Sequence, residues 1–64
     1  MQYPTIEEIR KFVEKAGLAF ERVRIDSGKY EFSIGRYDTS GNYDEFVRFR
    51  SAFAMKKLFA YIMK

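Results

Sequence analysis

The chain has 64 residues, enough for one small domain, and we expect residues 1–64 to form a single unit. Hydrophobic residues make up 47% of the chain, including seven Phe and five Tyr, which favours a folded protein over a disordered one. The absence of Cys and His excludes disulfides, thiol nucleophiles, the usual zinc sites and the commonest general base. The sequence shows neither a membrane-spanning pattern nor a signal-peptide pattern, so we expect a cytoplasmic protein.

The first predicted element is a helix over residues 5–16. Thr5 followed three residues later by Glu8 is typical of a capping box at a helix start. Gly17 ends the helix, since glycine is favoured directly after a helix C-cap. Apolar residues recur at helical spacing in between, at Ile6, Ile9, Phe12, Val13 and Ala16.

Three β-strands follow, because the periodicity changes from 3.6 residues to two after the first helix. The strands are predicted over residues 21–26, 30–35 and 43–50. Turn-forming residues join them at Ser27-Gly28 and over residues 38–42. Such closely spaced strands predict an antiparallel three-stranded meander.

Alternation along these strands predicts which side chains share the apolar face of the sheet. The expected members are Val23, Ile25, Tyr30, Phe32, Ile34, Val47 and Phe49. Leu18 and Phe20 are out of phase with Val23, so we expect a bend or bulge near Glu21.

The last predicted element is a helix over residues 52–63, with Ser51 as its N-cap. Its apolar stripe is formed by Met55, Leu58, Phe59 and Ile62. The predicted fold class is therefore α+β, a two-layer α-β-β-β-α arrangement in which both helices pack on one face of the three-stranded antiparallel meander.

The other face of the sheet is the first candidate site, because strand alternation predicts that it is basic. It is expected to carry Arg22, Arg24, Arg48 and Arg50, with Phe46 among them. Guanidinium groups match phosphate oxygens and an aromatic ring can stack on a base, so this set suits nucleic-acid binding. The alternative is an ordinary solvated sheet face, on which the arginines pair across strands with Glu31.

The final helix is the second candidate site, because it holds the whole net charge of +3. Acidic and basic residues balance over residues 1–50, and the excess comes from Lys56, Lys57 and Lys64. Phe53 and Tyr61 lie beside the apolar stripe near these lysines, which suits a protein partner, a homodimer or an anionic membrane surface. The alternative places Phe53 over a sheet edge as part of the core.

Catalysis and metal binding find little support. Glu7-Glu8 and Asp44-Glu45 are adjacent pairs whose side chains point in different directions. The spacing Asp38-x-Ser40-x-Asn42-x-Asp44 is similar to the start of a calcium loop, but its glycine and its twelfth residue differ from that motif. We therefore predict a polar hairpin turn there.

The element order resembles that of the double-stranded RNA-binding domain, which is also α-β-β-β-α at about this length. That family has a basic cluster at the start of its second helix, where this chain has Ser51-Ala52-Phe53-Ala54 and reaches Lys56 and Lys57 about a turn later. Residues 22–64 also resemble the β-β-β-α unit of some integrase-type DNA-binding domains. The first resemblance rests on element order, the second on element order and the arginines, and both imply nucleic-acid binding.

We therefore expect a small binding protein without enzymatic activity, cofactor, bound metal or small-molecule substrate. The first hypothesis is a nucleic-acid-associated regulator, of the kind that phages and mobile elements encode, which binds the phosphate backbone with low specificity. It would use the sheet arginines, helped by Lys56 and Lys57. The alternative is a protein-interaction module or inhibitor, including a homodimer, which uses the apolar last helix.

Overall fold

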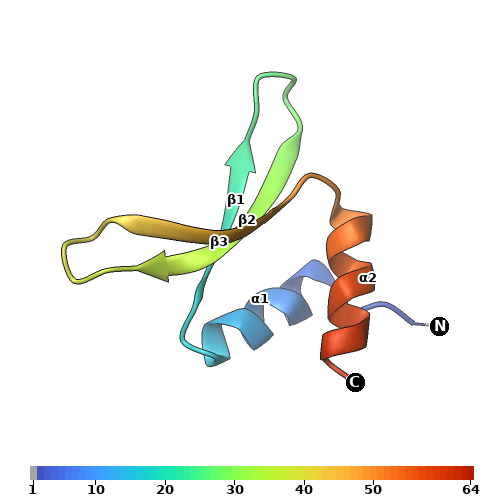
Figure 1. Cartoon of the computed structure of the whole chain (residues 1–64). Coiled ribbons are helices and arrows are strands. Elements are labelled where there is room, and N and C mark those ends of the chain that lie inside the picture. The colour runs from blue at the N-terminus through green and yellow to red at the C-terminus, as the bar shows by residue number, and fades with distance from the viewer. Residues whose placement is uncertain (1) are drawn as a thin grey trace.

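The structure is a computed structural model that describes residues 2–64, and it confirms the predicted α+β layout (Figure 1). Its three strands form one antiparallel sheet in the order β1-β2-β3, and both helices contact the sheet. The elements in chain order are α1 (Ile6–Lys15), β1 (Ala19–Arg24), β2 (Tyr30–Tyr37), β3 (Tyr43–Phe49) and α2 (Ala52–Ile62).

Both helices begin at the residues that their caps predict. The Thr5 hydroxyl accepts a hydrogen bond from the Glu8 backbone N–H at 3.1 Å, and the Glu8 carboxylate accepts one from the Thr5 N–H at 2.8 Å. The Ser51 hydroxyl accepts from the Ala54 N–H at 3.3 Å at the start of α2. Gly17 follows α1 with φ +83°, a backbone conformation that glycine adopts without strain.

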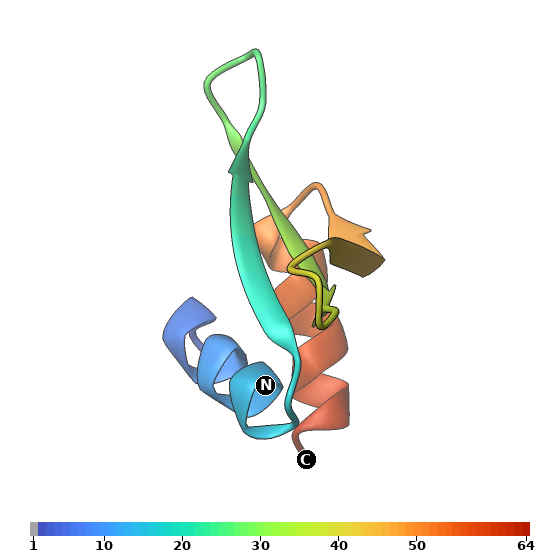
Figure 2. The same cartoon turned by 90° about the vertical axis from the view of Figure 1, so that its left-hand side faces the viewer.

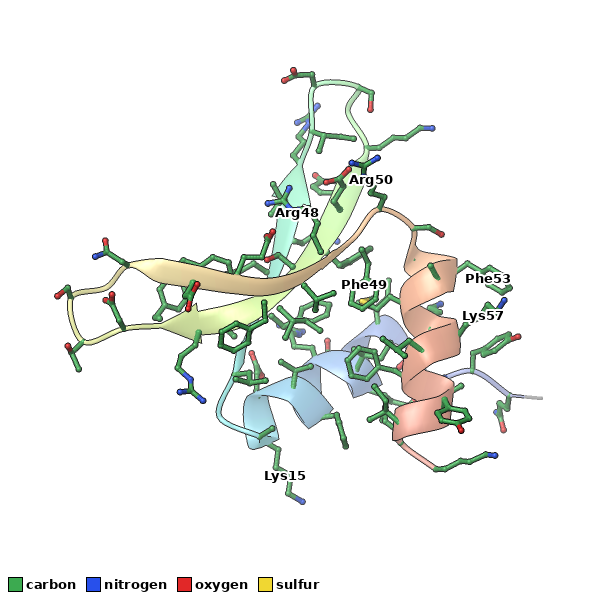
Figure 3. All side chains as sticks on the ribbon, in the orientation of Figure 1. Lys15, Arg48, Phe49, Arg50, Phe53 and Lys57 are labelled. Carbon is green, nitrogen blue, oxygen red and sulfur yellow. The ribbon has the colours of Figure 1, made fainter. Side chains whose placement is uncertain are left out.

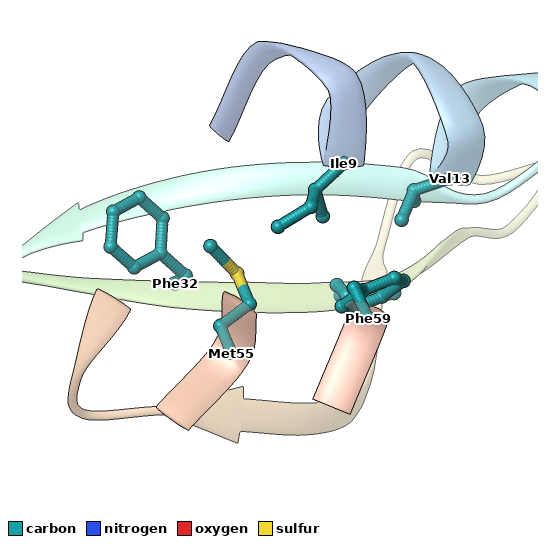
Figure 4. Close-up of a cluster of buried hydrophobic side chains, with 6 residues drawn as sticks. Ile9, Val13, Phe32, Met55 and Phe59 are labelled. Carbon is teal, nitrogen blue, oxygen red and sulfur yellow. The ribbon is translucent and has the colours of Figure 1, made fainter. Parts of the chain in front are cut away.

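The core lies between the two helices and the central strand. Side chains from α1 and α2 converge on β2 (Figure 4). We call this covered surface of the sheet the helix-side face and the opposite surface the open face. The buried apolar residues are Ile9 and Val13 of α1, Phe32 and Ile34 of β2, and Met55 and Phe59 of α2.

The register of the sheet confirms part of the predicted apolar face and corrects the rest. Phe32 pairs with Phe49 and Ile34 with Val47, all on the helix-side face as predicted. Val23 pairs with Glu31 and lies on the open face, contrary to the prediction. Ile25 lies beyond the end of β1, while Tyr30 is on the helix-side face but 44% exposed.

The predicted irregularity near Glu21 is wrong, since β1 pairs with β2 without a break. The register shift lies instead between β2 and β3, at Ile34 and Gly35. At Gly35 the two strands approach so closely that an added Cβ would overlap the backbone oxygen of Asp44. A glycine is needed here because any side chain would force the strands apart.

The apolar stripe of α2 is rotated relative to the prediction. Met55 and Phe59 are buried as predicted, but Leu58 and Ile62 are nearly half exposed. Ala52 and Met63 pack against the core in their place. The helix therefore leaves an apolar strip uncovered beside its buried face.

Both hairpins extend beyond the part of the sheet that the helices cover. The β1–β2 hairpin rises clear of α1 and α2 in both views (Figures 1 and 2). The Cα radius of gyration is 12.2 Å, against roughly 11 Å expected for a compact chain of this length. We call residues 22–31 the β1–β2 arm.

Candidate functional site

The arginines of β1 lie on the helix-side face, which corrects their predicted position on the open face. Arg22 pairs with Phe32 and Arg24 with Tyr30, so their side chains share the face of Phe20. Both arginines are exposed, although Arg22 lies close enough to α1 to line a cleft with Glu7 and Arg10. The predicted grouping of Arg22 and Arg24 with Arg48 on one face is therefore wrong.

The prediction failed because alternation indicates a buried face only where something covers the strand. The core covers β1 at Phe20, which packs against the buried cluster and against Phe32, with ring centroids 5.8 Å apart. Farther along the arm no helix covers either face, and Val23 is half-buried on the open face, so it gives no information about the core. Counting in twos from Phe20 would have placed Arg22 correctly.

One face of the β1–β2 arm is basic and the other is acidic. The Arg22 guanidinium carbon lies 4.5 Å from the ring centroid of Tyr30, close enough for a cation–π interaction. We call Arg22, Arg24 and Tyr30 the basic arm face. Among residues 2–64, no carboxylate forms an ion pair with either arginine. Glu31 of the arm lies on the opposite face, as does Glu21 just before the arm begins.

The open face carries a hydrogen-bond network centred on Ser33, which is fully buried. Its hydroxyl donates to Oε2 of Glu45 at 2.6 Å and lies 2.7 Å from the hydroxyl of Tyr43. Since the serine proton is used on the carboxylate, the Tyr43 hydroxyl is the donor to Ser33. Arg48 completes the network with ion pairs to Glu45 at 3.0 Å and to Glu31 at 3.2 Å.

The network neutralises Arg48 and makes the open face acidic. Hydrogen bonds from Arg48 and then from Ser33 hold the pKa of Glu45 below its ordinary value. The same carboxylates, Glu45 first and Glu31 second, raise the pKa of Arg48. With Glu21, which accepts a hydrogen bond from the Tyr37 hydroxyl, the face has three carboxylates and one guanidinium. It is not the basic surface that the sequence predicted.

The other residues predicted for nucleic-acid contact are dispersed. Arg50 follows β3 and lies where the chain passes into α2, near the foot of the arm (Figure 3). Phe46 stands next to the register shift in β3 and is 54% exposed. Lys56 is half-buried and Lys57 is exposed on α2. No single face unites these four residues with the basic arm face.

The outer side of α2 carries the residues predicted for a protein partner. Phe53 is 57% exposed and Tyr61 is 76% exposed, and lysines lie over both rings. Phe53 and Lys57 point away from the sheet (Figure 3). Phe53 meets the ring of Tyr3 edge-on at 5.6 Å, so it does not fold over a sheet edge. Lys64 lies 5.7 Å from the Tyr61 ring.

A cleft of about 510 Å³ lies between the start of α1 and β1, at the foot of the arm. Ile6 and Phe20 give it an apolar wall, Glu21 lines it from β1, and the exposed Arg22 belongs to both the cleft and the basic arm face. Arg10 and Glu7 line it as an ion pair, and the hydrogen bond from Arg10 lowers the pKa of Glu7. The sequence alone did not indicate this cleft, since it depends on how α1 and β1 approach each other.

The polar segment between β2 and β3 is a hairpin turn, as predicted. The Asp38 carboxylate accepts hydrogen bonds from the backbone N–H groups of Ser40 at 2.8 Å and Asn42 at 2.9 Å. Gly41 adopts φ +86° in this turn. The oxygen of Asp38 is therefore used to close the turn.

No protein-family model matches the chain, and neither a curated protein nor a solved structure was found to be similar to it. Within residues 2–64, no helix has the length and apolar character needed to cross a membrane.

Proposed function

We propose that the protein is a non-enzymatic nucleic-acid-binding protein that uses the basic arm face. The observation that carries this proposal is that Arg22 and Arg24 share one face of the β1–β2 arm, are both exposed, and form no ion pair with any carboxylate of residues 2–64. Free guanidinium groups form paired hydrogen bonds to phosphate oxygens. Arg48 has no part in this proposal, because Glu45 and Glu31 already neutralise it.

The chemistry of the arm favours backbone contact over recognition of base sequence. Glu31 on the opposite side of the arm repels phosphate, so the arm binds with one face only. Two phosphate contacts give a slope of about −1.4 for log affinity against log salt on a single strand.

The test is the binding of labelled oligonucleotides, followed by fluorescence anisotropy at about 50 and 200 mM salt. We expect Arg22→Glu combined with Arg24→Glu to weaken binding at least tenfold and to lower the salt slope by more than about 1. The matched control is Lys11→Glu combined with Lys15→Glu, which makes the same change in net charge on the exposed surface of α1.

Equal losses in both double variants would mean that only net charge matters, which contradicts a site on the arm. Absence of binding by the unaltered protein at low salt contradicts the proposal as a whole. Circular dichroism of each variant confirms that the fold is retained.

A protein-interaction module is the second candidate, and the exposed surface of α2 favours it. Tyr61, Phe53, Leu58 and Ile62 are each 44% exposed or more on a helix that has no acidic residue. A partner bound there would lose affinity with Phe53→Ser or Tyr61→Ser while oligonucleotide binding stays unchanged. Light scattering after size-exclusion chromatography measures whether the partner is a second copy of the chain.

A further inference from the structure

The cleft at the foot of the arm forms a continuous surface with the basic arm face. Phe20, Arg22 and Arg24 alternate along β1 on the helix-side face, so neighbouring members are about 6.8 Å apart. A nucleic-acid strand whose phosphates contact Arg24 and Arg22 runs along β1 toward Phe20 and the cleft. Arg22 lines the cleft and also lies over Tyr30 on the arm.

The cleft has room for one aromatic group, and its lining combines two apolar residues with four charged ones. Its 510 Å³ falls within the range of about 300–1,000 Å³ that small ligands occupy in proteins. Ile6 and Phe20 supply apolar contact, and Phe20 is only partly buried although its ring meets Phe32. The Arg10–Glu7 ion pair beside them offers both hydrogen-bond donors and acceptors.

The cleft beside α1 favours single-stranded over double-stranded nucleic acid. Residues of α1 form one wall of the cleft, and Glu21 and Arg22 from the two faces of the edge strand β1 form the other. A base in a duplex is paired and stacked, and it cannot enter such a cleft without leaving the helix. An unpaired base enters at no such cost and stacks on an aromatic side chain.

We infer that the preferred ligand is single-stranded nucleic acid, with its phosphates on Arg22 and Arg24 and one unpaired base in the cleft beside Phe20. This inference rests on the proposed function and adds a site for a base to it. Stacking on a protein aromatic ring is independent of base identity, so little sequence preference is expected.

The decisive experiment compares three labelled DNA probes of about 12 nucleotides, a length within the usual site sizes of single-strand-binding domains. The first is a single strand with all its bases, the second is a single strand of abasic sites with the same phosphates, and the third is a duplex. We expect the abasic strand to bind about 5- to 140-fold more weakly than the strand with bases, the effect of losing one stacked base. The duplex should also bind more weakly at equal salt.

A pair of variants locates the base. Ile6→Trp fills the cleft without changing any charge, and it should remove the difference between normal and abasic strands. Phe12→Trp is the control, since Phe12 is an exposed apolar residue of the same helix outside the cleft. The control should retain the full difference.

The outcomes separate this inference from the proposed function. Equal binding of the normal and abasic strands, with the arginine variant still weakened, overturns the base site and leaves backbone binding by the arm intact. Tighter binding of the duplex than of the single strand also overturns the base site and leaves backbone binding by the arm intact. Failure of all three probes to bind at low salt overturns the proposed function and this inference together.

Discussion

On the helix-side face of the sheet, apolar side chains of both helices bury Phe32 and Ile34. The basic arm face belongs to the same side of the sheet but is exposed to solvent. On the open face no helix covers the strands, and the chain buries Ser33 beneath its own polar neighbours instead. Burial of apolar area stabilises the first face, and hydrogen bonds and ion pairs stabilise the second.

This difference decides which charged groups are free to bind a ligand. Arg48 lies on the face that depends on polar contacts, so its guanidinium is occupied by two glutamates. Arg22 and Arg24 lie on the face where apolar packing stabilises the centre, so no carboxylate is required beside them. Whether an arginine is exposed therefore says less about its function than whether carboxylates on the same face already pair with it.

The largest expected effect comes from the helix-side face. Met55→Ala removes a fully buried side chain that lies between α2 and the sheet, and we expect it to lower the free energy of unfolding by about 2–5 kcal/mol. Leu58→Ala on the same helix is the control, because Leu58 is 44% exposed. Urea unfolding measures both variants. Equal losses would contradict the assignment of the core to one side of α2.

Gly35→Ala tests the close approach of β2 and β3, where the open face bends. An added Cβ overlaps the Asp44 backbone oxygen, and we expect a loss of about 1–3 kcal/mol because the obstacle is backbone and cannot rotate away. Gly41→Asn is the control, since position 41 has open space and asparagine tolerates its positive φ. A thermal scan that finds the alanine variant unchanged would contradict this register.

Ser33→Ala tests the polar network of the open face, and its effect should be smaller than that of either preceding variant. Two hydrogen bonds are lost, but Tyr43 and Glu45 are accessible enough to bind water instead, so we expect a loss of about 1 kcal/mol. Ser27→Ala, in the exposed β1–β2 turn, is the control and should have no effect. A loss as large as that of Met55→Ala would mean that both faces contribute equally to stability.

The sequence was sufficient for the parts of the fold that depend on local interactions. The capping residues Thr5 and Ser51 and the turns of the meander were predicted correctly, because each depends on residues within a few positions. The assignment of Arg22 to a face was wrong, because it depends on where the helices end over the sheet. The cleft between Ile6 and Phe20 was not predicted for the same reason.

The smallest expected effect is the pH dependence that the open face adds. Arg48 and Ser33 hold the pKa of Glu45 below its ordinary value of 4.5, so the folded state favours the ionised carboxylate. Glu45 therefore stabilises the fold fully above the pKa of the unfolded chain, and this contribution is lost as the pH falls through the lower folded value. Glu45→Gln should reduce the loss of stability below pH 4.5.

Urea unfolding at a series of pH values measures this slope for the protein and its variants. Some acid sensitivity should persist in Glu45→Gln, because contacts to Arg10 and to Thr5 also lower the pKa values of Glu7 and Glu8 on α1. Asp44→Asn is the matched control, since the neighbouring carboxylate forms no ion pair in the described part of the chain. If that control flattened the slope as much as Glu45→Gln, the stabilisation would come from general charge and not from the Ser33 network. The open face would then differ from the helix-side face only because no helix packs on it.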